Sequence, residues 1–246
     1  MNDNKLFHLA FDSTEYTAKF ALLAGDPART DTIALQFDNP KQIAYNREYK
    51  VWIAQHHGVD VFICSTGIGG PSAAIAVEEL YMAGVRTFLR IGTCGAMQPQ
   101  VKGGDLVIVQ SAVRQEGTSL QYAPIEYPAT ADFGIITALK QAAQNLGATA
   151  HIGVVQSKDS FYGQHTPERM PIADELLYKW NAFKKLGVLA SEMECAAIFT
   201  TAASLSAKAG CVLHVVWNQE TEKTADTNVS AAIKTATDAI KSICTF

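Results

Sequence analysis

The sequence predicts an α/β fold in which helices cover both faces of a mixed, largely parallel twisted sheet. Short apolar runs alternate with longer segments of helical periodicity along the whole chain, which is the pattern of a sheet with crossover helices. The chain has 246 residues, 48% of them apolar, and its mean hydropathy is +0.05, so it can bury a large core. Neither repeats nor low-complexity tracts divide it, and we expect one domain over residues 1–246.

The individual elements follow from the apolar pattern. Strands are predicted at 20–24, 51–54, 60–65, 86–91, 105–112, 152–156 and 211–217. Helices are predicted at 71–83, 132–146, 192–208 and 228–243. The helix at 71–83 opens on Pro71 and Ser72 and stops at Gly84. Another helix should begin at Pro27, because proline is favoured in the first helical turn.

The segment FLRIGTCGAMQP at 88–99 is predicted to be a strand that delivers Arg90 into a turn. Glycines at 92 and 95 would let backbone N–H groups approach an anion, while Thr93 adds a hydroxyl donor and Arg90 a fixed positive fork. The segment therefore predicts an oxyanion or phosphate cradle. The alternative is a buried arginine beside an ordinary glycine turn.

A second anion site is predicted in GDPART at 25–30, which follows the strand at 20–24. The free N–H groups of the helix that starts there would lie beside Gly25, with Arg29 one turn along. In sheets of this kind ligands collect beyond the carboxyl ends of strands, where GDPART, GIGG at 67–70 and GTCG at 92–95 are predicted to lie.

Several segments together resemble the nucleoside phosphorylase family, which includes uridine phosphorylases and hexameric purine nucleoside phosphorylases. They are GDPART, YNREYK at 45–50, STGIGGPSAAIAVEEL at 65–80 and FLRIGTCGAMQP, extended by FHL at 7–9, SFYGQ at 160–164 and SEMECAA at 191–197. FHL, SFYGQ and VVWNQE at 215–220 make the resemblance closest to the uridine-cleaving members. It covers nearly the whole chain and implies a three-layer fold and a pentosyltransferase of pyrimidine nucleoside salvage. The implied reaction is phosphorolysis of uridine to uracil and ribose 1-phosphate.

The resemblance also implies a site with three parts. The phosphate part would comprise Gly25, Arg29, Arg90, Thr93 and a neighbouring subunit's Arg47. The ribose part would comprise Glu192, Met193, Glu194 and a neighbouring subunit's His8. The base part would comprise Thr93, Cys94, Gly95, Phe161, Gln164 and Arg169. Arg90, Glu194, Gln164 and Arg169 would carry the catalysis.

Residue chemistry refines these expectations at three points. Residues two apart on a regular helix face about 200° apart, so we expect one of Glu192 and Glu194 to bind and the other to support. The amide of Gln164 can both donate to a uracil carbonyl and accept from N3–H. In GQHTPER the arginine stands five positions after the glutamine, farther than in the family pattern. Either the loop presents Arg169, or His165 takes part of its role.

An oligomer is also implied, because His8 and Arg47 would complete a neighbour's site. We expect sites shared across a dimer and a hexamer built as a trimer of dimers. A monovalent cation such as K⁺ is implied at the dimer interface, held by Glu48, Ile68 and Ser72. We expect no other cofactor, with phosphate as co-substrate.

Composition argues against several other classes of protein. The net charge of −4 and the lack of basic runs argue against nucleic-acid binding. No signal-peptide pattern and no uninterrupted apolar stretch of about 18 residues appears, so we expect a cytoplasmic protein that does not bind membranes. Five scattered cysteines predict no disulfide framework, and the spacing of the six histidines predicts no metal site.

Two alternative functions stay open. A purine nucleoside phosphorylase of the same fold is disfavoured by Gln164 and by Asn218, which has no carboxyl proton to give where the purine-cleaving relatives carry an aspartate. Asn218 could also be only a strand-end turn residue. From a different class, GIGGPS at 67–72 could belong to a dinucleotide-dependent oxidoreductase or a non-catalytic nucleotide-binding module. Ser72 in place of the third glycine argues against that class.

Overall fold

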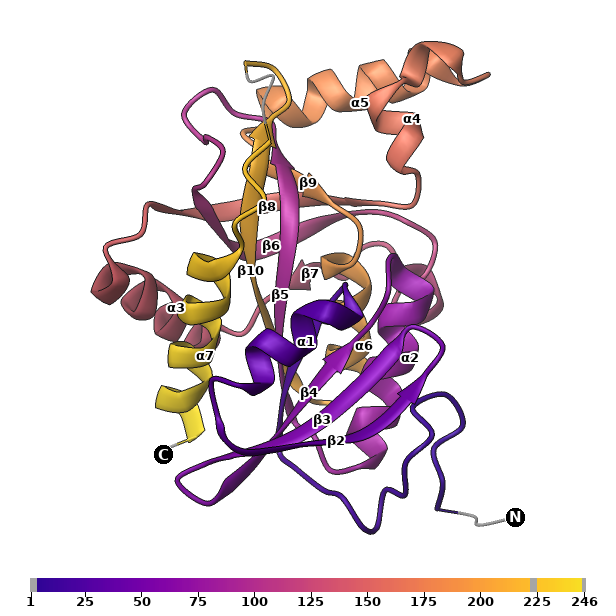
Figure 1. Ribbon diagram of the computed structural model, residues 1–246. Coiled ribbons are helices and arrows are strands. Elements are labelled where there is room, and N and C mark those ends of the chain that lie inside the picture. Colours follow the sequence, from indigo (N-terminus) through magenta and orange to yellow (C-terminus); the bar gives the residue numbers. More distant parts are fainter. Residues whose placement is uncertain (1–3, 222–224, 245–246) are drawn as a thin grey trace.

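A computed structural model describes residues 4–221 and 225–244 as one large sheet with helices on both faces (Figure 1). The strands are β1 (Phe20–Ala24), β2 (Asp38–Asn46), β3 (Tyr49–His56), β4 (Val59–Ser65), β5 (Thr87–Ala96), β6 (Leu106–Gln115), β7 (Ala129–Thr130), β8 (Ala150–Lys158), β9 (Ala190–Glu192) and β10 (Lys208–Asn218). The helices are α1 (Pro27–Ala34), α2 (Gly70–Met82), α3 (Phe133–Leu146), α4 (Phe161–His165), α5 (Ala173–Lys185), α6 (Cys195–Ser204) and α7 (Ser230–Cys244).

The side chains of the central strands point alternately to the two faces of the sheet, and this produces the three layers. Leu22 of β1 and Leu89 of β5 belong to the core beneath α1, α3 and α7. Their chain neighbours Leu23 and Phe88 belong to the core beneath α2 and α6. Because successive side chains of a strand point to opposite faces, buried strands with apolar residues at every position support helices on both sides. The predicted α/β class is confirmed.

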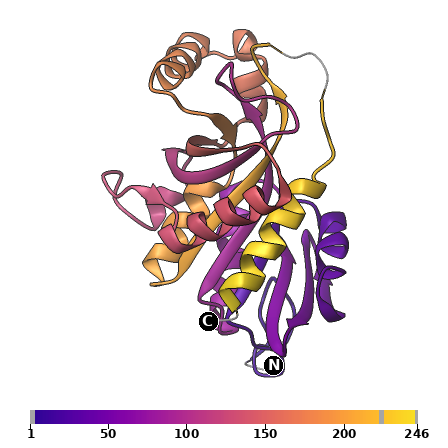
Figure 2. The same cartoon turned by 90° about the vertical axis from the view of Figure 1, so that its left-hand side faces the viewer.

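The sheet closes on itself at one end, which the sequence did not predict. Its strand order is β10-β6-β8-β9-β5-β1-β4-β3-β2, and β10 also pairs in parallel with β5. The strands β5, β9, β8, β6 and β10 therefore form a closed ring, while β1, β4, β3 and β2 extend from it as an open sheet. Figure 1 shows β5 and β10 side by side through the centre of the molecule, and Figure 2 shows the same arrangement turned by 90°.

Every predicted strand and helix has a counterpart, but the turn predicted at 92–95 is wrong. Residues 92–95 continue β5 as far as Ala96 and pair with β10. The glycines there provide space for neighbours: a Cβ at Gly92 would lie 2.6 Å from Cδ2 of Leu213, and one at Gly95 would lie 2.7 Å from Nε2 of Gln219. Residues 92–95 are therefore part of strand β5 and do not form a turn at its end.

The predicted helix at 192–208 begins later, because Glu192 is the last residue of β9 and α6 starts at Cys195. Three strands, β2, β7 and β9, and two helices, α4 and α5, were not predicted. Across residues 4–221 and 225–244, none of the helices combines the length and apolar character needed to cross a bilayer.

Candidate active site

A cavity of about 740 Å³ lies where the carboxyl-terminal parts of β1, β4, β5 and β10 meet the start of α6. It brings together most of the residues predicted for phosphate, ribose and base, although they come from distant parts of the chain. Those that line it are Gly25, Arg29, Thr93, Arg90, Cys94, Gly95, Phe161, Glu192, Met193 and Glu194. This is the edge of the sheet at which ligands of α/β proteins bind.

Two guanidinium groups give part of the cavity a positive charge. Arg29 stands in the first turn of α1, and Arg90 projects from β5. Burial, and then the nearby charge of Arg90, lower the pKa of Arg29. No hydrogen-bond acceptor for the Arg29 guanidinium occurs within the part of the chain that the structure describes. Two close cations of which one lacks a partner are typical of an anion site.

Gly25 lets the chain approach this positive region closely. A Cβ there would lie 3.3 Å from the carbonyl oxygen of Gly67 and 3.8 Å from Nη2 of Arg90. A larger residue would therefore fill space between β1 and Arg90. The N–H groups expected to be free at the start of α1 are bonded to Asp26 instead: its side chain accepts from Ala28 at 2.9 Å and its carbonyl from Arg29 at 3.1 Å, while Pro27 has no N–H.

Arg90 and Glu194 form a buried ion pair at the cavity wall. Nη2 of Arg90 lies 2.5 Å from Oε2 of Glu194, and both side chains are about 95% buried. The other carboxylate oxygen of Glu194 accepts from the N–H of Gly69 at 2.7 Å. Each oxygen has two lone pairs, so Glu194 keeps capacity to accept from a ligand hydroxyl.

Glu192 shapes the chain around Glu194. Its Oε2 accepts from the N–H groups of Glu194 and Cys195 at 2.7 and 2.9 Å, and its Oε1 from the hydroxyl of Ser157. These bonds hold the first turn of α6 and leave Glu192 in a supporting position. Burial, and then the Glu194 carboxylate, raise the pKa of Glu192.

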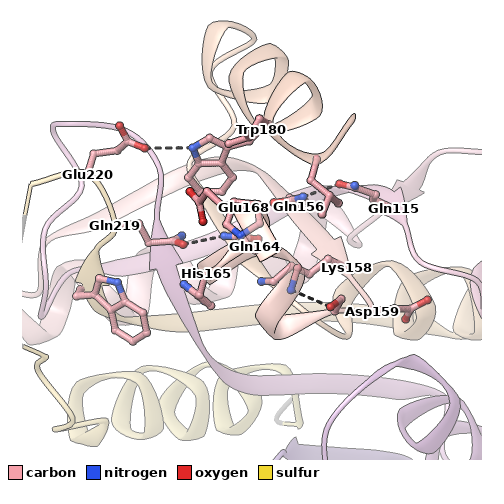
Figure 3. A pocket seen from close by; sticks show the side chains of 16 residues that line it. Gln115, Gln156, Lys158, Asp159, Gln164, His165, Glu168, Trp180, Gln219 and Glu220 are labelled. Atoms are coloured by element: carbon pink, nitrogen blue, oxygen red, sulfur yellow. Dashed lines mark hydrogen bonds between the residues drawn. The ribbon is translucent and has the colours of Figure 1, made fainter. Parts of the chain in front are cut away.

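A second cavity, of about 420 Å³, adjoins the first and shares Lys158, His165 and Trp217 with it (Figure 3). It contains Gln164, whose amide is fixed at both ends. The Ser191 hydroxyl donates to Oε1 of Gln164 at 2.6 Å, and Nε2 of Gln164 donates to Oε1 of Gln219 at 2.7 Å. One amide hydrogen and one carbonyl lone pair of Gln164 remain for a ligand.

Aromatic rings lie between the two cavities. The rings of Phe161 and His165 are 4.2 Å apart between centroids, and those of His165 and Trp217 are 5.6 Å apart. Burial, and then the charge of Lys158, lower the pKa of His165, so its ring is predominantly neutral at pH 7. This wall can stack on a flat ligand.

The structure does not bring Arg169 to either cavity. Arg169 is exposed at the end of a short 3₁₀ helix (Pro167–Arg169), and its guanidinium lies 5.2 Å from the ring centroid of Tyr162. The five-residue spacing places the arginine beyond the turn that presents Gln164. Asn218 is also committed elsewhere: its Nδ2 donates to the carbonyls of Gln98 and Val101, both at 2.8 Å, and its Oδ1 accepts from backbone N–H groups.

His8 and Arg47 lie outside the cavity of their own chain. Nδ1 of His8 is 2.7 Å from Oε1 of Glu79, whose carboxylate also accepts from the backbone of His8 and Leu9. Arg47 is exposed in the turn between β2 and β3 and has a φ of 53°, in the left-handed region. Both positions are compatible with reaching another subunit.

The residues predicted for a cation lie together. The Ser72 hydroxyl donates to Oε1 of Glu48 at 2.7 Å, and Ile68 and Glu48 line the larger cavity. The hydrogen bond from Ser72, the largest effect, lowers the pKa of Glu48. Occupation by an ion stays a prediction. Within the described residues, no cluster of histidine, cysteine and carboxylate side chains has the arrangement of a metal site.

Sequence reasoning missed Lys158, Ser191, Trp217 and Gln219. Lys158 is the last residue of β8, and its Nζ lies 2.6 Å from the Ser191 hydroxyl. It is 7% exposed, and burial lowers its pKa to about 8. The available signal was the position of a lysine just after the predicted strand at 152–156, at an edge where ligands bind.

Comparison with known proteins identifies the family of this chain. The family model described as "Phosphorylase superfamily" matches residues 19–245. Uridine phosphorylase of Treponema pallidum (strain Nichols) is 42% identical over 244 residues, which cover 97% of this chain and 94% of that protein. Uridine phosphorylase of Escherichia coli (strain K12) is 43% identical over 223 residues, covering 89% and 88%. Guanosine phosphorylase of Halorubrum lacusprofundi is 40% identical over 237 residues, covering 92% and 94%.

Proposed function

This chain belongs to the phosphorylase superfamily, and we propose that it is an enzyme that cleaves uridine with inorganic phosphate to uracil and ribose 1-phosphate. The observation that carries the proposal is a pair of adjoining cavities, of which the larger contains an arginine pair and a buried carboxylate and the smaller contains a fixed glutamine amide. A nucleoside and an oxyanion need these three kinds of group side by side.

Phosphate would bind between Arg29, Arg90, Thr93 and the backbone at Gly25. Hydrogen bonds to charged groups contribute about 1.5–3 kcal/mol each, so two guanidinium groups can hold and orient the anion. Arg47 of a neighbouring subunit would supply a third. The catalytic gain comes from holding the phosphate oxygen in line with the anomeric carbon.

Ribose would bind over Met193, with its 2′- and 3′-hydroxyls donating to Glu194. Arg90 is paired with the Glu194 carboxylate and would touch the phosphate as well, so it links nucleophile and sugar. The negative carboxylate also favours the positive charge that develops on the sugar as the glycosidic bond breaks. His8 of a neighbour would bind the 5′-hydroxyl.

Uracil would bind beside Phe161 and against Gln164. The remaining amide hydrogen and lone pair of Gln164 match a uracil carbonyl and N3–H, and the bonds from Ser191 and to Gln219 fix which end of the amide donates. Thr93, Cys94 and Gly95 would form the floor, since all three line the cavity. In this structure Arg169 would need a different loop conformation to reach the base.

Cleavage of purine nucleosides is the less favoured alternative. One relative carries the name guanosine phosphorylase. Protonation of a purine ring needs an acid, however, and both side-chain atoms of Asn218 are bonded to backbone groups. Asn218 therefore acts at the end of β10 as a turn residue.

We also propose that the working unit is a homo-oligomer with sites shared across a dimer, assembled as a hexamer. The exposed Arg47 and the His8 beside Glu79 support this, because neither can serve the cavity of its own chain. The interface would hold a K⁺ ion at Glu48, Ile68 and Ser72.

The experiment that tests the function follows ultraviolet absorbance of uridine, deoxyuridine, thymidine, inosine and guanosine with and without phosphate. We expect phosphate-dependent cleavage of uridine, with kcat/KM well above that for the purine nucleosides. Cleavage of uridine without phosphate would mean a hydrolase. If kcat/KM is higher for guanosine than for uridine, the enzyme is a purine nucleoside phosphorylase.

A further inference from the structure

We propose that Lys158 is a catalytic residue whose ammonium group donates to a carbonyl oxygen of the departing base and stabilises its negative charge. The inference rests on the proposed function and assigns a residue to its least defined step. Neither Arg29 nor Arg90 can take this role, because both belong to the region proposed for phosphate.

Lys158 lies where the two cavities meet. It ends β8 and lines both cavities, together with His165 and Trp217, where the aromatic wall and the Gln164 amide meet (Figure 3). The smaller cavity contains Gln164 but neither arginine of the phosphate region. Lys158 therefore stands where the base is proposed to bind.

The ammonium group of Lys158 keeps donors for a ligand. In the described part of the chain, the one hydrogen bond of Nζ is to the neutral hydroxyl of Ser191, at 2.6 Å, and no carboxylate lies within ion-pair distance. An ammonium has three donors, so two remain for a ligand. A buried charge without an anionic partner is costly and persists where a partner arrives during function.

The charged groups around Lys158 agree with a cation at rest. Burial, the largest effect, lowers the pKa of Lys158 to about 8, whereas Glu192 and Glu194 raise it, so most of the side chain is protonated at pH 7. His165 is the other titratable group of this wall, and its pKa is lowered. Lys158 is thus a cation beside a neutral ring.

The same side chain is linked to base recognition. Nζ donates to Ser191, and Ser191 donates to Gln164, so the ammonium polarises the hydroxyl that fixes the amide. Arg169, by contrast, is exposed beside Tyr162. Lys158, at the end of β8, therefore provides the cation beside the base that Arg169 does not provide from its loop.

The chemical step balances as follows. A phosphate oxygen bonds to C1′ while the C1′–N1 bond breaks, and the electron pair of that bond passes to the uracil ring and its carbonyl oxygens. Lys158 stays protonated and donates to one of these oxygens as its charge grows. Overall, the proton carried by hydrogen phosphate ends on uracil, so Lys158 is unchanged after each turnover.

The test compares leaving groups in single turnovers with saturating phosphate. Lys158→Met is expected to lower the rate of uridine cleavage by about 10²–10³-fold, the usual loss for one donor to a developing anion, with a small change in uridine affinity. For 5-fluorouridine, whose base leaves more easily, the loss should be clearly smaller. Lys158→Arg, which keeps the charge, should recover part of the rate.

Lys179→Met serves as the matched control, because Lys179 is an exposed lysine paired with Glu175 on α5. It should behave as the wild type with both nucleosides. If Lys158→Met does not fold, Lys158→Gln removes the charge with a side chain of similar reach and gives the same comparison.

Equal losses for uridine and 5-fluorouridine, or a loss confined to binding, would overturn the proposal. So would a leaving-group-dependent loss that appears in Arg169→Ala and is absent in Lys158→Met. Failure of the proposed function is a separate outcome, since the wild type would then cleave neither nucleoside with phosphate.

Discussion

At the scale of single residues, the pair of Arg90 and Glu194 combines binding with stability. Because both side chains are about 95% buried, removing one partner leaves an uncompensated charge. Arg90→Ala should therefore lower the free energy of unfolding by about 3–5 kcal/mol and nearly abolish phosphorolysis, with a raised phosphate requirement. Urea denaturation and phosphate saturation curves measure the two effects.

The double variant Arg90→Met with Glu194→Leu separates the effect on stability from the effect on activity. Replacing both partners by apolar residues should restore stability but leave the enzyme inactive. If Arg90→Ala is saturated by phosphate at the same concentrations as the wild type, Arg90 does not belong to the phosphate site.

Lys158 gives a second prediction at this scale, on pH dependence. Its pKa is lowered from 10.5 to about 8, so its burial disfavours folding below pH 8, and this effect disappears as the pH rises above 10.5. At pH 7, Lys158→Met should be more stable than the wild type by up to about 3 kcal/mol. The difference should fall as the pH rises from 8 to 10.5.

Denaturation of both proteins across this pH range provides the measurement, with Lys179→Met as control. A difference that does not change with pH would mean that Lys158 is not buried as a cation.

At the scale of elements, β5 depends on a glycine for its pairing with β10. A Cβ at Gly92 would lie 2.6 Å from Cδ2 of Leu213 and 3.3 Å from Nε of Arg90. Gly92→Ala should cost about 1–3 kcal/mol of stability and reduce activity, because the buried side chains of Leu213 and Arg90 must shift. Chemical denaturation and kcat check this.

Gly117→Ala is the control for Gly92→Ala, since its new Cβ would meet only Oδ2 of Asp159, at the ordinary distance of 3.8 Å. Equal stabilities of the two variants would contradict the steric account.

The same elements show how far the sequence can be read. Apolar runs located the buried strands because their side chains define them. β2, with mostly exposed polar residues, and β9, with three residues, are defined by their partner strands and carry no signal of their own. α5 has no buried residue, so its apolar positions form no stripe that faces a core.

The site was predictable where it lies along single segments. GDPART, the arginine of β5 and SEMECAA each carry their chemistry locally, and the cavity collects them. The chain of bonds from Lys158 through Ser191 and Gln164 to Gln219 joins β8, β9, α4 and the end of β10. Such an arrangement depends on which strands are neighbours, which the apolar pattern does not specify.

At the scale of the whole molecule, the sharing of sites between subunits is testable. His8→Ala and Glu194→Gln should each be inactive. A mixed dimer would contain one site with both an intact Glu194 and an intact partner His8, so mixing should restore part of the activity. Each variant dissociated and reassembled alone is the control.

Activity is measured after native mass spectrometry verifies the mixed oligomers. Verified mixtures without recovery would refute shared sites and make His8 a surface residue held by Glu79.

The closed ring of strands also determines which part of the molecule opens last. Along Leu89 to Ile91, β5 is hydrogen-bonded to β1 on one side and to β10 on the other, so exposing these amides requires it to separate from central strands. We therefore expect the amides of Leu89 to Ile91 to exchange with deuterium only through global unfolding, whereas those of the edge strand β2 exchange by local opening. Arg90 would thus be fixed in the slowest-exchanging part of the protein, and α4 with Gln164 could move without disturbing it.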